Sequence, residues 1–106
     1  MYLEPPIHIS ERKLTHYLLI KLDRDDKSNY LSLAGYTLAN WQLLERDLLN
    51  LTEGGNAIFE RSSPFGDLFS VTGNLTGPNG RLLVVKTIWM AETKTSLTKF
   101  VTLYPP

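Results

Sequence analysis

The strongest hydrophobic pattern of the chain lies in its last quarter, at residues 81–92. Side chains of a β-strand point alternately to opposite faces, and here both alternating sets are largely apolar. One set comprises Leu83, Val85, Trp89 and Ala91, and the other Leu82, Val84, Ile88 and Met90. A strand with two apolar faces needs cover on both, so this segment is predicted to lie near the middle of a sheet. Residues 97–104 are predicted to form the strand that follows.

Two weaker strands precede this segment. Residues 67–76 alternate cleanly, with Phe69, Val71 and Leu75 on one side and polar side chains on the other, which predicts a strand with one solvated face. Residues 57–61 are predicted as a further short strand that ends before Pro64, because proline cannot donate to a sheet ladder. The turn at 77–80 is Gly-Pro-Asn-Gly, which favours a hairpin.

The first half of the chain has helical periodicity instead. Ser10 is a suitable N-cap for a helix over 10–20, and a second short helix is expected to end at Gly35. The longest helix is predicted over 37–52, where apolar residues recur at spacings of three and four. They are Leu38, Trp41, Leu44, Leu48 and Leu51. Residues 1–9 are expected to form an extended arm, either a short edge strand or a packed segment.

Together these patterns predict an α+β domain spanning 1–106, with two to three N-terminal helices packed on a three- to four-stranded antiparallel β-meander. A chain of 106 residues with 42% hydrophobic content is long enough for a single core. No segment is predicted to be a signal peptide or a membrane span. We therefore expect a soluble, cytoplasmic protein without a membrane partner.

Composition excludes several kinds of chemistry. The chain has no cysteine, so it has no disulfide, thiolate zinc site or cysteine nucleophile. Its 11 basic and 11 acidic residues cancel, so binding to a nucleic acid would need a local cationic patch. No phosphate-binding, zinc or calcium motif is present, and we expect neither a cofactor nor a metal. The aspartates around residues 23–26 are read as a solvated charged turn.

A few side chains remain as candidates for chemistry. His16 could transfer a proton at neutral pH, or it could be an ordinary polar residue of a surface helix. Lys86 stands in an apolar row and either extends to solvent or is held there for a purpose. Thr98, Phe100, Thr102 and Tyr104 are predicted to share one face of the last strand, as a half-buried surface or the floor of a polar groove.

Several of these segments resemble a family of small bacterial proteins of unknown function, whose members also occur as C-terminal modules of toxin-like proteins. The resemblance spans about residues 11–105. It rests on Lys13-Leu14, Tyr17–Leu19, Lys27, Tyr30-Leu31, Leu33–Tyr36, Trp41, Leu44, the 77–80 turn, Lys86–Trp89 and Phe100–Tyr104. The family pattern has a histidine and basic residues before the lysine matched by Lys27, whereas this chain has Asp23-Arg24-Asp25-Asp26. The element order is also similar to that of the barnase, EndoU and RelE ribonucleases.

Two hypotheses follow. In the first, the chain is a metal-independent, toxin-like ribonuclease: Lys27 and Arg81 bind phosphate, His16 moves a proton, and Thr102 or Tyr104 orients the 2′-hydroxyl. Lys86 and Thr87 are further candidates for substrate binding. In the second, the chain is a binding or assembly module without catalytic activity, which recognises a cognate partner protein through a sheet edge or its helical face.

Overall fold

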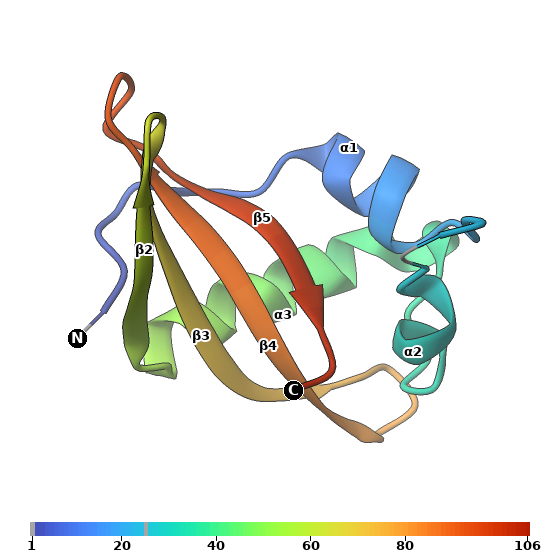
Figure 1. The fold of residues 1–106 in the computed structure, drawn as a ribbon. Helices are drawn as coiled ribbons and strands as arrows, with labels where there is room; N and C mark the ends of the chain where they lie inside the picture. The colour runs from blue at the N-terminus through green and yellow to red at the C-terminus, as the bar shows by residue number, and fades with distance from the viewer. Residues whose placement is uncertain (1, 25) are drawn as a thin grey trace.

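The computed structural model describes residues 2–24 and 26–106, and its centre is a five-stranded sheet (Figure 1). The strand order is β1-β5-β4-β3-β2. The strands are β1 (Ile7–His8), β2 (Ala57–Ser63), β3 (Gly66–Thr76), β4 (Leu82–Glu92) and β5 (Thr98–Tyr104). The doubly apolar segment, β4, is the middle strand, as the sequence predicts.

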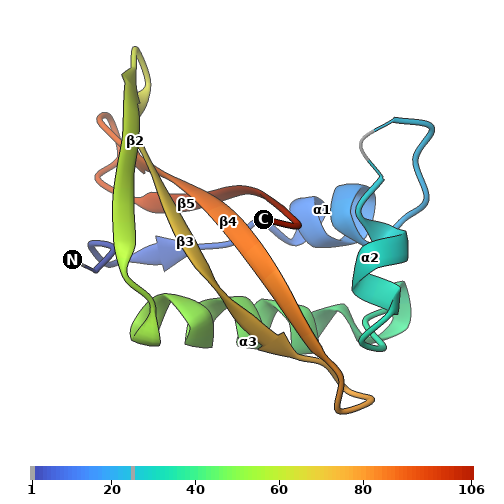
Figure 2. The same ribbon diagram turned by 60° about the horizontal axis from the view of Figure 1, so that its bottom comes forward.

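The helices form close to the predicted positions. Helix α1 (Glu11–Lys13) continues into the π-helical turn η1 (Leu14–Leu18), α2 covers Ser28–Ser32, and η2 (Leu38–Asn40) leads into α3 (Trp41–Gly54). Thr37 and Asn40 form a reciprocal capping box at the start of η2, which satisfies backbone donors that have no helical partner. Figure 2 shows α3 running across one face of the sheet, with α1 and α2 at one end of it.

The sheet is mixed rather than purely antiparallel, and this corrects the prediction. Strands β2 to β5 form the expected antiparallel meander, but β1 pairs with β5 in parallel. The hydroxyl of Thr98 donates to the carbonyl of Glu4 at 2.7 Å, and its amide donates to the carbonyl of Pro6 at 3.0 Å. The arm before the first helix therefore adds one more strand, β1, to the predicted meander. Two apolar residues of the arm do not specify whether β1 pairs in parallel or in antiparallel fashion.

Trp89 joins the helices to the sheet. It is fully buried, and its ring meets that of Phe100 edge-to-face at 5.2 Å between centroids. Leu44 and Leu48 of α3 belong to the same hydrophobic cluster, and burying one such leucine stabilises the fold by about 1.5–3 kcal/mol. The indole N–H donates to the hydroxyl of Thr87 at 2.8 Å, so this core also satisfies its polar atom.

The opposite face of β4 is open, which corrects the prediction that both faces are covered. All three helices lie on the inner side or at the end of the sheet (Figure 2). On the outer face, Leu82 is 60% exposed and Val84 is 44% exposed. Ile88 and Met90 are half-buried. The apolar outer row of β4 therefore forms part of a solvent-facing surface.

A β-bulge in β5 inverts the alternation of inward and outward side chains along the strand. Trp89 pairs with Phe100 while Ile88 pairs with Thr102, so Val101 is the extra residue. Phe100 therefore faces the core, whereas Thr102 and Tyr104 face outward, because an inserted residue inverts the alternation. The prediction that Thr98, Phe100, Thr102 and Tyr104 share one face is wrong for this reason.

We expect Thr87→Val to destabilise the protein by about 1–3 kcal/mol, because it leaves the buried indole N–H of Trp89 without an acceptor. The substitution also removes the 2.7 Å hydrogen bond from the Thr87 hydroxyl to the carbonyl of Val71. Urea unfolding measures the change. Thr72→Val is the matched control, since Thr72 is exposed on the neighbouring strand. Equal stability of the two variants would contradict the proposed role of this hydrogen-bond chain.

Candidate functional site

Two lysines converge on Tyr104 at the outer face of the sheet. The Nζ atom of Lys27 lies 5.7 Å from the centre of the tyrosine ring, and that of Lys86 lies 6.0 Å from it. Lys27 is the N-cap residue of α2, and Lys86 of β4 is the direct cross-strand partner of Tyr104. Such distances permit cation–π attraction. Three separate parts of the chain thus bring two cations to one aromatic ring.

A carboxylate completes this group. The Oε1 atom of Glu60 lies 3.6 Å from Nζ of Lys86, and Oε2 accepts a hydrogen bond from the hydroxyl of Ser70 at 3.1 Å. Glu60 occupies a β-bulge in β2, where the pairing shifts between Phe59 and Arg61. We call Lys27, Glu60, Lys86 and Tyr104 the outer-face cluster; each of its members is in contact with solvent.

Residues of α1 and η1 contact β5 just before Tyr104. The hydroxyl of Tyr17 lies 2.9 Å from that of Thr102, and Nζ of Lys13 donates to the carbonyl of Val101 at 3.0 Å. The helical turn therefore contacts β5 at its bulge. Thr102 points to the outer face two residues before Tyr104, so its hydroxyl borders the outer-face cluster.

Asp26, the residue before Lys27, accepts hydrogen bonds from both sides of that lysine in the chain. Its Oδ1 atom accepts hydrogen bonds from the amide of Leu22 at 3.2 Å and from the amide and hydroxyl of Ser28 at 3.3 and 2.7 Å. These bonds, that of the Ser28 hydroxyl above all, lower the pKa of Asp26, because they stabilise the charged form. Asp26 thus supports the segment that carries Lys27, while Asp25 lies outside the described residues.

Two residues that the sequence proposes for the site, Thr87 and Arg81, lie away from the outer-face cluster, and the described contacts of a third, His16, do not join it to the cluster. Thr87 is fully buried on the inner face, with its hydroxyl occupied by Val71 and Trp89, so it cannot contact a ligand in this structure. Arg81 precedes β4, about 16 Å along the chain from Lys86 at the usual rise of a strand. His16 is exposed, and its Nδ1 atom lies 2.8 Å from the hydroxyl of Thr15.

Sequence reasoning missed Glu60. The segment around it gives only a weak strand signal, and its side chain reaches Lys86 through a bulge in β2 and the pairing of β2, β3 and β4. Strand parity did place Lys86 correctly, on the face of Val84 and Ile88. To predict the cross-strand contacts of Lys86 requires the strand register, which local sequence patterns do not contain.

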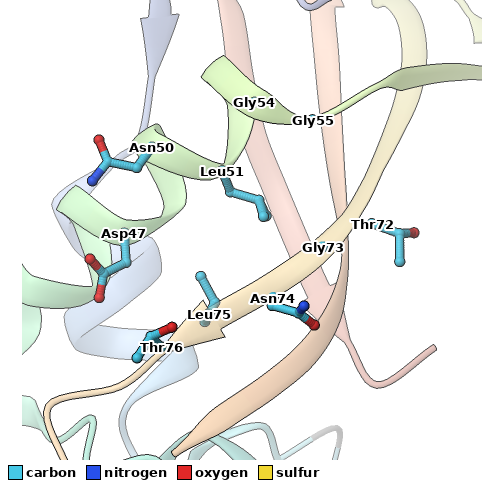
Figure 3. Close-up of a pocket in the computed structure, with 10 residues that line it drawn as sticks. All are labelled: Asp47, Asn50, Leu51, Gly54, Gly55, Thr72, Gly73, Asn74, Leu75 and Thr76. Carbon is cyan, nitrogen blue, oxygen red and sulfur yellow. The ribbon is translucent and has the colours of Figure 1, made fainter. Parts of the chain in front are cut away.

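A separate hollow of about 430 Å³ lies between α3 and β3 (Figure 3). Its only charged side chain is Asp47, together with Asn50, Thr72, Asn74 and Thr76 among its polar residues. Asp47 already accepts hydrogen bonds from Tyr36 and Arg46. Burial, and then the neighbouring Asp47, raises the pKa of the Tyr36 hydroxyl above its ordinary range. This hollow contains none of the residues proposed from the sequence, and its acid has a structural role.

Two further properties concern residues 2–24 and 26–106. Within them, no three histidine or acidic side chains gather in a way that could bind a metal ion. None of their helices combines the length and apolar character that crossing a membrane requires.

We expect Ser28→Ala to raise the pKa of the Asp26 carboxyl towards its ordinary value of about 3.9, because the substitution removes the main hydrogen bond to its charged form. Since the folded pKa is lowered, the stabilisation from Asp26 is present above its unfolded pKa and is lost as the pH falls through the folded one. NMR titration of the side-chain carboxyl measures the shift. Ser32→Ala in the same helix is the control, because that hydroxyl bonds the carbonyl of Asn29. An unchanged pKa in Ser28→Ala would refute this account.

Comparisons with known proteins give one similar fold and one matching family. A solved chain from the contact-dependent growth inhibition toxin–immunity protein complex of Klebsiella pneumoniae 342 has a similar fold, with a TM-score of 0.70 and 16% sequence identity. The similarity covers 92% of this chain and 98% of that one. No curated protein matches the sequence significantly. A family model described as a domain of unknown function matches residues 5–106, and the chain therefore belongs to the DUF6883 family.

Proposed function

We propose that this chain is a toxin-like ribonuclease domain that binds RNA on the outer face of its sheet and cleaves it without a metal ion. The observation that carries the proposal is the convergence of Lys27 and Lys86 on Tyr104. The similar fold of a chain from a toxin–immunity protein complex agrees with a toxin-like role.

The outer-face cluster has the groups that RNA binding requires. Two ammonium groups beside one carboxylate leave a local positive charge, which attracts a phosphodiester. The ring of Tyr104 offers a flat surface for a base, since bases of single-stranded RNA commonly stack on aromatic side chains. Lys27 and Lys86 would also stabilise the additional negative charge of a pentavalent phosphorane. Thr102 is on the same face as Tyr104, two residues before it, and its hydroxyl would donate to a ribose or phosphate oxygen.

The open position of the cluster suits a polymer. Tyr104 is near the end of β5, and the outer face continues from it across β4 to Thr72 of β3, which pairs with Lys86. A strand of RNA could therefore cross the sheet without entering a closed cavity. The zero net charge of the chain is compatible with this proposal, because phosphate is attracted by the local pair of lysines.

A protein partner is the second candidate, favoured by the apolar residues of the same face. Leu82 and Val84 are exposed on the middle strand, and exposed apolar residues that adjoin one another are typical of protein interfaces. The structural relative comes from a complex of two proteins. A partner that covers this face would compete with RNA, so the two candidates differ in their response to the variants below.

We expect the purified protein to cleave total RNA in the presence of a chelator, and Lys27→Ala and Lys86→Ala each to lower the cleavage rate about 10²-fold or more, as loss of a transition-state charge contact does. Gel electrophoresis of labelled RNA measures the rate. Lys99→Ala is the matched control, because Lys99 is paired with Glu92 at 3.1 Å and has no contact with Tyr104 among those that the structure describes.

Equal loss of activity in Lys99→Ala would argue against a site at Tyr104. Absence of both cleavage and RNA binding in the wild-type protein would refute the ribonuclease proposal. If a partner protein then bound the wild-type chain and lost affinity on Leu82→Asp or Val84→Asp, the second candidate would replace it.

A further inference from the structure

We infer that Glu60 is the general base of this site and takes the proton of the attacking 2′-hydroxyl. The inference rests on the proposed ribonuclease function and adds a catalytic residue that sequence patterns did not reveal. The observation behind it is the contact of one exposed carboxylate with a lysine of the phosphate-binding pair. Glu60 and Lys86 lie on adjoining parts of the outer face and are 3.6 Å apart at their charged atoms.

The two oxygens of Glu60 have different surroundings. Oε2 is held by the hydroxyl of Ser70 at 3.1 Å, while Oε1 faces Nζ of Lys86. A carboxylate oxygen has more than one acceptor site, so Oε1 can accept a proton from a substrate beside Lys86. The bond from Ser70 fixes the orientation of the side chain, and the bulge in β2 places it over the sheet.

Four other candidate bases have side-chain contacts of their own. Glu92 accepts from Thr95 and pairs with Lys99, and these contacts lower its pKa. Asp67 accepts a hydrogen bond from Ser62 at 2.9 Å, and Asp26 is occupied by the loop before α2. The Nδ1 atom of His16 lies 2.8 Å from the hydroxyl of Thr15. Glu60 is the acid among these whose carboxylate adjoins a cation of the outer-face cluster.

The reaction is an internal transesterification. A phosphate bound by Lys27 and Lys86 places the neighbouring 2′-hydroxyl near Glu60, which removes its proton as the 2′-oxygen bonds to phosphorus. The bond between phosphorus and the 5′-oxygen breaks, which leaves a 2′,3′-cyclic phosphate. The 5′-oxygen takes a proton from water, and the protonated Glu60 returns its proton to the resulting hydroxide. Atoms and charge are then balanced without a metal ion or other reactant.

The test is the variant Glu60→Gln, which keeps the size of the side chain and an oxygen for Ser70 but is not a base. We expect kcat on a defined RNA oligonucleotide to fall about 100-fold or more, as expected for loss of a general base. RNA affinity should be equal or higher, because a negative charge beside the phosphate is removed. Glu92→Gln, which breaks the ion pair of Glu92 with Lys99 on the same face, should behave like the wild type.

A second substrate separates a base from an acid. An oligonucleotide with sulfur in place of the scissile 5′-oxygen has a leaving group that needs no proton. This substrate therefore restores the cleavage rate of a variant that lacks the general acid, whereas a variant that lacks the general base still cleaves it slowly. We expect Glu60→Gln to remain slow on this substrate. Unfolding curves of both glutamine variants should match that of the wild type, which excludes a merely structural effect.

Several outcomes would overturn the inference while leaving the ribonuclease function intact. They are near-wild-type kcat in Glu60→Gln, full rescue of that variant by the sulfur substrate, or a rate loss in His16→Ala with Glu60→Gln active, which would make His16 the base. A wild-type protein that cleaves no RNA would instead refute the proposed function, and the inference with it.

Discussion

The position of the candidate site depends on a single extra residue in the last strand. Phe100 and Leu103 are both buried in the core, and their spacing of three is incompatible with regular strand alternation. The bulge at Val101 resolves this conflict, because it lets both side chains face inward. Tyr104 then necessarily faces outward, on the same face as its cross-strand partner Lys86. The packing requirement of the core thus determines which side chain the outer face presents.

The second requirement is that the sheet is covered on one side. Trp89 fills the inner face against Phe100 and donates its N–H to Thr87, so the polar atom of the largest core residue is satisfied within the strand that carries it. Helix α3 packs on this side with Leu44 and Leu48. The remaining helices lie at one end of the sheet, so the outer face of β4 stays open to solvent or to a ligand (Figure 2).

Local patterns predicted much of the fold, because each strand and helix has its own periodicity. Alternation also bears on Thr87: it lies on the same strand face as Val85 and Trp89, and this parity alone predicts burial rather than contact with a substrate. The family resemblance points to Lys27, and the resemblance together with the polar residues of the last strand points to Tyr104. The two bulges were not predictable from alternation, and Glu60 depends on one of them. The pairing direction of a strand as short as β1 likewise cannot be predicted from local sequence.

The charge balance of the chain explains why composition was uninformative about the site. A neutral protein can attract an anion only where its own acids are held apart from its bases. Short-range contacts account for part of this separation: Asp47 of α3 is engaged by Tyr36 and Arg46. Asp26, next to Lys27 in the chain, stays negatively charged, because its hydrogen bonds stabilise the ionised form. Lys27 and Lys86 face Tyr104, and Glu60 is the carboxylate paired with Lys86. The electrostatic character of the outer face therefore depends on where the fold places each acidic and basic side chain. The total numbers of acidic and basic residues do not give it.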